Sequence, residues 1–184
     1  MELTDEELAL LVQNGDKEKF GLLMERYERK LFRYGSRFLS NNDNVEDVVQ
    51  EIFIKTYQSI QSFDIKQRFS PWIYRIAHNM FVNAIKKKSR SPLSYIDFDT
   101  LISHPIYEDP MPAEEEQKKI KEMIDKSLDS IDQKYREILI LFYIEELGYK
   151  EISEILRIPV GTVGIRLLRA REALKKRLPE EYKR

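Results

Sequence analysis

A cluster of cationic side chains near the end of the chain has the chemistry of a nucleic-acid contact. Between Arg166 and Arg177 the sequence carries six Lys and Arg residues and a single acid, Glu172. Lys and Arg bind nucleic acids by neutralising backbone phosphates, and Arg can also donate two hydrogen bonds to a guanine edge. This segment is therefore the first candidate for a nucleic-acid-binding surface.

Two predicted helices joined by a tight turn would present these cations. Ile152, Ile155 and Leu156 recur at helical spacing in the first helix. Pro159 marks the turn, because proline suits the first position of a helix and not its interior. The inward stripe of the second helix consists of Val163, Leu167, Ala170 and Leu174. A basic second helix after a short turn is the shape of a helix-turn-helix that enters the DNA major groove. The alternative is an ordinary αα-hairpin with a solvated charged face.

A second cationic segment, residues 71–90, combines basic side chains with aromatic and amide groups and contains no acid. Its basic residues are Arg75, Lys86, Lys87, Lys88 and Arg90, and the interleaved groups are Trp72, Tyr74, His78, Asn79 and Asn83. Bases stack on aromatic rings while cations hold phosphates, so this pattern favours a single-stranded nucleic acid. Two simpler interpretations are that Trp72 is a core residue and that the lysine run is a solvated helix end.

Four helices are predicted before residue 90, each with an apolar side that packs inward. The first begins at Thr4, which forms a capping box with Glu7. The second spans about residues 17–39, and the fourth begins at Pro71 with Ser70 as its cap. The inward residues of the first helix are Leu8, Leu11 and Val12. Those of the second are Phe20, Leu23, Met24, Tyr27, Leu31, Tyr34 and Phe38, and those of the fourth are Ile73, Ile76, Ala77, Met80, Val82 and Ala84.

The third helix, predicted over residues 45–59, has an unusually wide apolar arc. The arc consists of Val48, Val49, Ile52, Phe53 and Ile60, and the other side carries Asp47, Gln50, Glu51 and Lys55. A helix of this kind packs on more than one face or lends an apolar edge to a partner. A plain core helix is the simpler interpretation of this stretch alone.

Charge divides the chain of 184 residues into three parts. Residues 1–90 carry 15 basic and 13 acidic side chains, residues 91–117 carry none and 7, and residues 118–184 carry 16 and 12. The middle part holds four prolines and shows no helical period, which predicts an acidic linker. We therefore expect an all-α protein of two helical domains: an N-terminal helical bundle over 1–90 and a helix-turn-helix domain over 118–184.

Two further helices are predicted ahead of the helix-turn-helix. One restarts at Glu114 and the next spans residues 133–147, with Ser130 or Asp132 as its cap and Gly148 closing it. The apolar residues of the first are Ile120, Met123, Ile124 and Leu128. The residues of the second that are expected to pack on the helix-turn-helix are Leu139, Phe142 and Tyr143.

The sequence lacks the residues that several classes of function require. The chain has no cysteine, so it forms neither a disulfide nor a thiolate metal site. The HExxH, P-loop and Gly-rich dinucleotide motifs are absent, and no cofactor or metal ion is predicted. No apolar run approaches the roughly 18 residues of a membrane span, and the acidic N-terminus is not that of a signal peptide. We expect a cytoplasmic protein.

Four segments, in their order along the chain, match the pattern of a known family. The first two are DVVQEIFIKTY (residues 47–57) and FSPWIYRIAHNMFVNAIKKKSR (residues 69–90). The others are residues 131–163 and RLLRAREALKKRL (residues 166–178). With these segments on either side of an acidic linker, nearly the whole chain resembles the extracytoplasmic-function (ECF) sigma factors, a two-domain class of bacterial transcription initiation subunits.

The resemblance implies that the third helix binds the clamp coiled coil of the polymerase large subunit. The residues implied there are Asp47, Val48, Gln50, Glu51, Phe53 and Lys55. The loop at 63–70 and the helix after it would melt the minus-ten element and capture a flipped base, whose extrusion costs on the order of a few kcal/mol. The residues implied in that role are Arg68, Phe69, Trp72, Arg75, Asn79, Asn83, Lys86, Lys87 and Lys88.

The resemblance also implies that the helix-turn-helix reads the minus-thirty-five element as duplex DNA. The residues implied there are Tyr149, Lys150, Thr162, Arg166, Arg169 and Arg171. The chain departs from the family at Gly164 and Ile165, where most relatives have Lys-Ser. Gly164 removes a DNA contact, and Ile165 faces either a thymine methyl group or a protein partner. Asn83 is a further departure, because relatives commonly have an acid there.

The implied function is promoter-specific transcription initiation, without catalysis by the chain itself. The expected partners are core RNA polymerase, promoter DNA and an anti-sigma protein, often membrane-bound. The third helix, Ile165 and Leu168 are candidate contacts for the anti-sigma protein.

Two other functions would use the same cationic surfaces. A polymerase-independent helix-turn-helix regulator would bind a duplex operator as a symmetric dimer, but it leaves the first domain without a task. A nuclease or recombinase would need a cluster of carboxylates near the basic helices. The candidates for such a cluster are Asp43, Glu46, Asp47 and Glu51.

Overall fold

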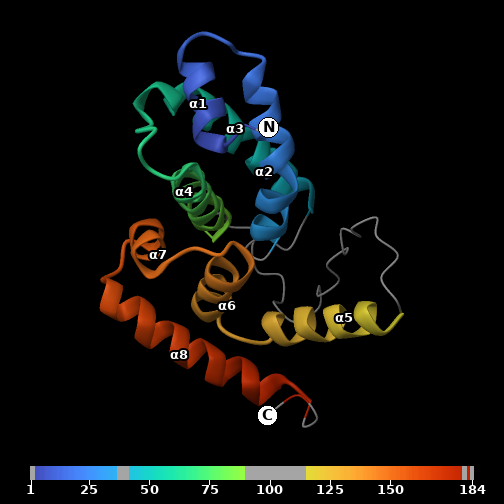
Figure 1. Cartoon of the computed structure of the whole chain (residues 1–184). Helices are drawn as coiled ribbons and strands as arrows, with labels where there is room; N and C mark the ends of the chain where they lie inside the picture. The colour runs from blue at the N-terminus through green and yellow to red at the C-terminus, as the bar shows by residue number, and fades with distance from the viewer. Residues whose placement is uncertain (1–2, 37–41, 90–114, 180–181, 183–184) are drawn as a thin grey trace. The chain divides into compact units, whose positions relative to one another are not determined.

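A computed structural model describes residues 3–36, 42–89, 115–179 and 182 of the chain. The secondary structure of these residues is entirely helical, and the chain forms two compact units, Met1–His104 and Pro105–Arg184 (Figure 1). The all-α fold with two helical domains is thereby confirmed. Most of the predicted acidic linker lies outside the described residues, although residues 115–117 already belong to a helix. None of the helices in the described ranges combines the length and apolarity that a bilayer crossing requires.

Over residues 3–36 and 42–89, the N-terminal unit is built of four α-helices and one short 3-10 turn (Figure 1). They are α1 (Asp5–Gln13), α2 (Lys19–Ser36), α3 (Asn42–Ser59), the 3-10 turn η1 (Ile60–Ser62) and α4 (Phe69–Ser89). Contacts join α2 to α1, α3 and α4, so α2 lies at the centre of this unit. The core therefore forms around the apolar face of α2.

The start of α1 has the predicted capping box. The Glu7 N–H donates to Thr4 Oγ1 at 3.2 Å, and the Thr4 N–H donates to Glu7 Oε2 at 2.7 Å. These bonds satisfy backbone donors that have no partner inside the helix. Of the predicted inward residues, Leu8 and Val12 are buried and Leu11 is half-buried.

The inward stripe of α2 is confirmed at five positions and wrong at one. The confirmed residues are Phe20, Leu23, Tyr27, Leu31 and Tyr34. Met24 is 40% exposed. It follows Leu23 by one residue, which places it about 100° around the helix from that core position. Phe32, which the pattern did not predict, is buried instead, and Phe38 lies outside the described residues.

The helix α4 begins two residues earlier than predicted and buries two aromatic rings that the sequence pattern left on its surface. Tyr74 and Phe81 are fully buried and both pack edge-on against Tyr34, at ring distances of 5.3 and 5.9 Å. Placing Tyr74 among the surface aromatics was therefore wrong. Ile73 and Ala77 are buried as predicted. The other predicted inward residues, which are half-buried, are Ile76, Met80, Val82 and Ala84.

In the described part of the C-terminal unit there are four α-helices and a π-helical segment. They are α5 (Glu115–Asp129), α6 (Gln133–Leu139), the π segment η2 (Ile140–Ile144), α7 (Tyr149–Leu156) and α8 (Val160–Arg177). Among the described elements of this unit, α6 and α8 pack against each other most extensively. Arg136 of α6 ties α5 in place, because its guanidinium donates to the carbonyls of Leu128 at 2.9 Å and Asp129 at 2.7 Å.

The helix predicted over 133–147 does not run as one α-helix, because it changes to π-helix at Ile140. Gly148 is the N-cap of α7, where its N–H donates to Glu151 Oε2 at 2.6 Å, and does not close the preceding helix as predicted. Leu139 is buried as expected and Phe142 is half-buried. Tyr143 is 54% exposed, but its ring lies 5.4 Å from the guanidinium of Arg171 in α8, so it contacts the helix-turn-helix as predicted.

The turn between α7 and α8 is held by backbone geometry and one side chain. Arg157 caps α7 in the left-handed conformation, with φ of 53°, and Ser153 Oγ donates to the Ile158 carbonyl at 2.6 Å. Pro159, predicted as the first helical residue, is the N-cap of α8, so the helix begins one residue later than predicted, at Val160. Five residues of the predicted stripes are buried, namely Ile152, Ile155, Val163, Leu167 and Ala170. The other two, Leu156 and Leu174, are half-buried.

Candidate nucleic-acid and protein-binding surfaces

An aromatic cluster lies at the start of α4. The Trp72 ring is half-buried and packs on Phe63 at 5.1 Å and on Phe69 at 5.5 Å. Phe69 is fully buried, with its ring 5.3 Å from Phe63 and 5.5 Å from Tyr27. Phe69 therefore supports the cluster from within and presents no surface to a base, whereas Trp72 keeps part of its ring accessible.

One face of α4 gathers polar and cationic side chains. Arg75, Asn83, Lys86 and Lys87 are exposed, and Asn79 is half-buried. Because they recur at intervals of three or four residues, Arg75, Asn79, Asn83 and Lys86 share one side of the helix. Asn79 Nδ2 donates to the Arg75 carbonyl at 2.8 Å. The side chain of Lys88 lies outside what the structure describes.

The loop from Asp64 to Arg68 is exposed at every residue. Asp64 closes a turn inside it, because its carbonyl accepts the Gln67 N–H at 2.9 Å and its Oδ1 accepts the Lys66 N–H at 3.0 Å. Such an Asx turn fixes the loop locally. Of the predicted contact residues, Arg68 belongs to this loop and lies next to the aromatic cluster in sequence.

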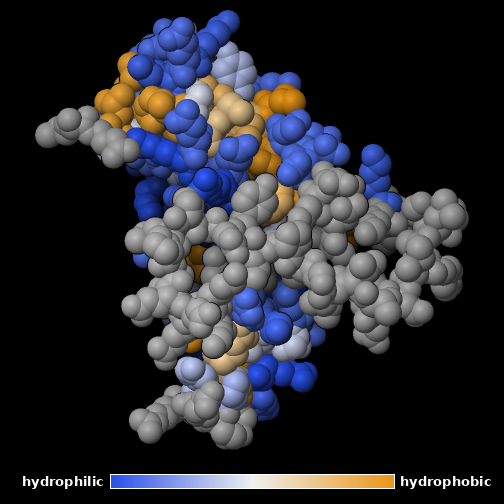
Figure 2. All heavy atoms as spheres, turned by 90° about the vertical axis from the view of Figure 1, so that its right-hand side faces the viewer, coloured by the Kyte–Doolittle hydropathy of each residue, from blue (hydrophilic) through white to orange (hydrophobic). Residues whose placement is uncertain are grey.

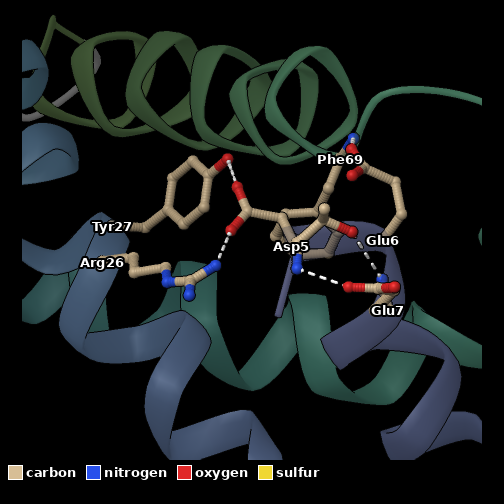
Figure 3. A network of polar contacts seen from close by, with 7 residues as sticks. Asp5, Glu6, Glu7, Arg26, Tyr27 and Phe69 are labelled. Atoms are coloured by element: carbon tan, nitrogen blue, oxygen red, sulfur yellow. Dashed lines mark hydrogen bonds and ion pairs between the residues drawn. The ribbon is translucent and has the colours of Figure 1, made fainter. Parts of the chain in front are cut away.

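Contacts from α1 reach both ends of this loop, and the sequence pattern did not reveal them. Glu6 Oε1 accepts the Phe69 N–H at 2.8 Å (Figure 3), and Gln13 Nε2 donates to the carbonyls of Ile60 at 2.7 Å and Phe63 at 2.9 Å. The partners are separated by about fifty residues or more, so no local motif signals the pairing.

A partly buried polar network anchors α1 on α2 (Figure 3). Asp5 forms an ion pair with Arg26 at 2.6 Å and accepts a hydrogen bond from the Tyr27 hydroxyl, also at 2.6 Å. Burial, and then the hydrogen bond to Asp5, raise the pKa of Tyr27 well above its ordinary value. Tyr27 therefore stays a hydrogen-bond donor throughout the neutral range.

The helix α3 presents a mixed polar and apolar face. The predicted residues Asp47, Gln50, Glu51 and Lys55 are exposed, and Val48 is half-buried. Phe53 is only 4% exposed and packs on Phe20 at 6.4 Å, so it belongs to the core and offers no contact area to a partner. Ile54, which the sequence did not single out, is 58% exposed and supplies the apolar edge instead.

Apolar side chains reach the surface elsewhere in the N-terminal unit. Figure 2 shows apolar areas between hydrophilic ones on its upper part, which is the N-terminal unit. The exposed large apolar residues of this unit are Leu3, Leu10, Leu22, Met24, Ile54, Tyr57 and Ile65. Ile54 and Tyr57 both come from α3, so this helix carries two of them three residues apart.

The helix α8 brings three of the predicted DNA contacts together and separates one. Thr162, Arg166 and Arg169 recur at intervals of four and three residues and therefore share a side. Arg171 lies half a turn from Thr162, on the opposite side. Its guanidinium stacks over the rings of Phe142 at 5.8 Å and Tyr143 at 5.4 Å. Arg171 thus packs on the π segment and lies away from the other three residues.

The start of α7 carries Tyr149, whose ring packs against the π segment and lies close to Gly164 of α8. Tyr149 is 40% exposed and its ring packs 5.6 Å from Phe142, while Lys150 is exposed. A Cβ at Gly164 would meet the Tyr149 ring at 3.5 Å, an ordinary contact, so space alone does not require glycine there. Ile165 and Leu168 are each 56% exposed, as the sequence indicated.

The fold defines the class of the protein: an all-helical chain of two units, of which the second is a helix-turn-helix. Two family models match it, Sigma-70 region 2 over residues 23–91 and Sigma-70 region 4 over residues 121–174. These segments fall in the N-terminal and the C-terminal unit respectively.

Named relatives narrow the class. The ECF RNA polymerase sigma factor SigW of Bacillus subtilis is 37% identical, over 97% of this chain and 98% of its own length. The ECF RNA polymerase sigma-E factor of Escherichia coli K12 is also 37% identical, over 94% of this chain and 93% of its own length. The fold is similar to that of the sigma factor RpoE of Bartonella quintana, solved with the anti-sigma factor NepR. That match has a TM-score of 0.71 at 22% identity and covers 91% of this chain and 99% of that one.

The chain belongs to the family of ECF RNA polymerase sigma factors. It is therefore a transcription initiation factor and not an enzyme, as the sequence predicted.

Proposed function

We propose that the chain divides the work of promoter recognition between its units. The exposed face of α3 would bind core RNA polymerase, α4 and the loop before it would hold melted minus-ten DNA, and α8 would read the minus-thirty-five element as duplex. The observation that carries this proposal is a pair of cationic helix faces, one in each unit: Arg75, Lys86 and Lys87 are exposed on α4, and on α8 Arg169 is exposed and Arg166 half-buried.

The α4 surface has the chemistry that a melted strand requires. The accessible part of Trp72 can stack on an extruded base, and Arg75, Lys86 and Lys87 can neutralise the phosphates that follow. Stacking on an aromatic ring is worth about 1–3 kcal/mol per base, which is of the same order as the cost of unstacking one. The surface therefore favours a strand that is already open over the closed duplex.

The α8 surface suits paired DNA. Thr162 lies in the first turn of the second helix of the helix-turn-helix, where side chains reach base edges, and Arg166 and Arg169 continue the same side. Ile165 stands next to this side and could contact a thymine methyl group. The contact with core polymerase and the two contacts with DNA would each be weak alone and would add because one chain links them. The free protein, which lacks the polymerase contact, should therefore bind promoter DNA poorly.

An anti-sigma protein is the regulator we propose for this chain. The solved RpoE of the same fold was captured with such a partner, which supports the proposal. The exposed apolar side chains of Ile54 on α3 and of Ile165 and Leu168 on α8 would be covered in that complex. A protein with these partners would act in the cytoplasm.

Transcription with purified components tests the proposal. Core RNA polymerase from the same organism is incubated with its fragmented genomic DNA, with and without the chain, and the 5′ ends of the transcripts are sequenced. We expect discrete start sites that depend on the chain and share an upstream sequence. A set of 5′ ends that is the same with and without the chain would count against the proposed function.

A matched pair of variants assigns the open strand to α4. Lys86→Gln with Lys87→Gln should reduce permanganate reactivity of melted thymines, because two phosphate contacts are lost. Lys126→Gln with Lys134→Gln removes the same charge from exposed positions of the other unit that are not among the predicted contacts, and should leave melting unchanged once the complex has formed at saturating protein. Equal losses of melting in both variants would contradict the assignment.

A further inference from the structure

We infer that α1 is a splint for promoter melting: Gln13 at one end and Glu6 near the other hold both ends of the exposed loop from Asp64 to Arg68. The two side chains are positioning residues and need not touch DNA. The inference rests on the proposed role of this loop and of α4 in holding the open strand.

The first anchor fixes the entry to the loop. Gln13 is the last residue of α1, and its amide donates to the Ile60 carbonyl at 2.7 Å and the Phe63 carbonyl at 2.9 Å. In the opposite direction, Gln61 Nε2 of η1 donates a hydrogen bond to the Gln13 carbonyl at 3.1 Å. These three bonds tie the end of α1 to η1, directly before the loop begins at Asp64.

The second anchor fixes the exit from the loop. The Phe69 N–H is the first of α4, and such donors have no partner inside their own helix. Glu6 Oε1 accepts this N–H at 2.8 Å (Figure 3). The carboxylate also complements the partial positive charge of the helix start. Pro71, the third residue of α4, has no N–H and so leaves no unpaired donor there. The Phe69 N–H does need an acceptor, and Glu6 supplies it.

The splint itself is fastened to the body of the unit. Asp5, next to Glu6, is held by Arg26 and Tyr27 of α2, each at 2.6 Å (Figure 3). Leu8 and Val12 on the same helix are buried in the core. Because α1 is anchored along its length, the distance between its two contacts with the loop is fixed.

The two anchors also hold the aromatic cluster in place. Phe63 and Phe69 are the residues that directly bracket the loop, and their rings pack against each other at 5.3 Å and against Trp72. Releasing either anchor would let Phe63 or Phe69 move, and the end of the loop that this residue holds would shift relative to Trp72. A loop that is already ordered loses less conformational entropy on binding a strand, which favours capture.

Limited trypsin digestion of the full chain tests the splint without any promoter. Lys66 and Arg68 are the trypsin sites inside the loop, and mass spectrometry reports cleavage after each. We expect Gln13→Ala and Glu6→Ala to raise the initial rate of cleavage at these sites about fivefold, the effect of losing a bond worth about 1 kcal/mol. Glu18→Ala, which removes an exposed acid that makes none of these contacts, should leave the rate unchanged.

Glu6→Gln separates the hydrogen bond from the charge. The glutamine carbonyl can still accept the Phe69 N–H, so most of the protection should return in this variant. Cleavage after Lys66 and Arg68 at wild-type rates in both Glu6→Ala and Gln13→Ala would overturn the splint.

The promoter experiment then asks whether the splint serves melting. In complexes formed at saturating polymerase, Gln13→Ala and Glu6→Ala should lower the fraction of open promoter several-fold, while the affinity for core polymerase stays at the wild-type value. Faster loop cleavage with undiminished melting would overturn the positioning role. If the wild-type chain itself supported no transcription, the proposed function would fail, and the digestion result would still decide whether α1 holds the loop.

Discussion

At the scale of single residues, the ionisation of Tyr27 makes the stability of the N-terminal unit depend on pH. Its ring is buried, and its hydroxyl donates to the Asp5 carboxylate at 2.6 Å. Burial and this bond raise the pKa of Tyr27 above its ordinary value, so the folded state holds the phenol proton more tightly than the unfolded state does. Stability from this residue is complete below the unfolded pKa of about 10 and is lost as the pH rises above it.

Tyr27→Phe should reveal this linkage. Near neutral pH the variant should be less stable by about 1.5–3 kcal/mol, because the Asp5 carboxylate loses a hydrogen bond. Above pH 10 only the wild type loses the Tyr27 contribution, so the two free energies of unfolding should converge by up to about 1.4 kcal/mol per pH unit. Urea titrations followed by circular dichroism measure this difference. A gap between the two proteins that stayed constant from pH 8 to above pH 10 would refute it.

Two glycines of α2 should respond in opposite ways to the same substitution. A Cβ at Gly35 would overlap the ring of Phe81 and lie 3.0 Å from Val45 Cγ1, whereas nothing lies within 4 Å of a Cβ at Gly21. Gly35→Ala should therefore destabilise the unit by about 1–3 kcal/mol through overpacking. Gly21→Ala should stabilise it by about 0.5–1 kcal/mol through helix propensity. The same sign for both in urea unfolding would show that the close approach of α2 and α4 is not tight.

At the scale of elements, the turn between α7 and α8 stores backbone strain. Arg157 has a φ of 53°, which costs a residue with a Cβ roughly 1–2 kcal/mol. Arg157→Gly should raise the thermal stability of the C-terminal unit by an amount equivalent to about 1 kcal/mol, since glycine adopts this conformation freely. Arg157→Ala is the matched control, because it removes the charge and keeps the Cβ. Equal stabilities for the two variants would assign the effect to charge.

Local pattern predicted most elements, and tertiary contacts decided the rest. The capping box of Thr4, the apolar face of α2 and the two helices of the helix-turn-helix follow from short-range spacing, which one sequence contains. The start of α4 at Phe69 depends on Glu6, and spacing along one helix holds no trace of such a partner. For the same reason the splint contacts of α1 were not predictable.

For the candidate surfaces too, local spacing could not predict the contacts made between helices. Helical spacing predicted part of the buried side of α4 and most of that of α8, but it could not tell which aromatic rings the neighbouring helices bury. Tyr74 and Phe69 are covered by α2 and by the aromatic cluster, while Trp72, in the same turn, keeps part of its ring accessible. The family resemblance grouped Arg171 with the DNA contacts, whereas its guanidinium stacks on the rings of the π segment, on the other side of α8.

At the scale of the whole molecule, the proposed division of labour predicts separable defects. Asp47→Ala with Glu51→Ala should weaken binding to core polymerase and leave the upstream DNA contact intact. Arg166→Ala should do the reverse and cost about tenfold in protection of the upstream element, the usual effect of one lost base or phosphate contact. Core affinity is measured by titration of labelled polymerase and the upstream contact by footprinting of the assembled complex.

Arg171→Ala is the control for Arg166→Ala, because it removes the same charge from the opposite side of α8. The upstream footprint should survive this change, apart from any general loss of stability from the missing stack on Phe142 and Tyr143. Defects of all these variants in the same binding step would contradict the division of labour.

The chain has a single tryptophan, and it lies in the ring cluster beside the splinted loop. Indole emission excited at long wavelength therefore originates from one known place in the N-terminal unit. Because Trp72 is half-buried, a base stacking on its accessible part would quench that emission. The protein thus carries a built-in optical probe, with which the moment of strand capture can be timed by stopped-flow mixing without attaching any dye.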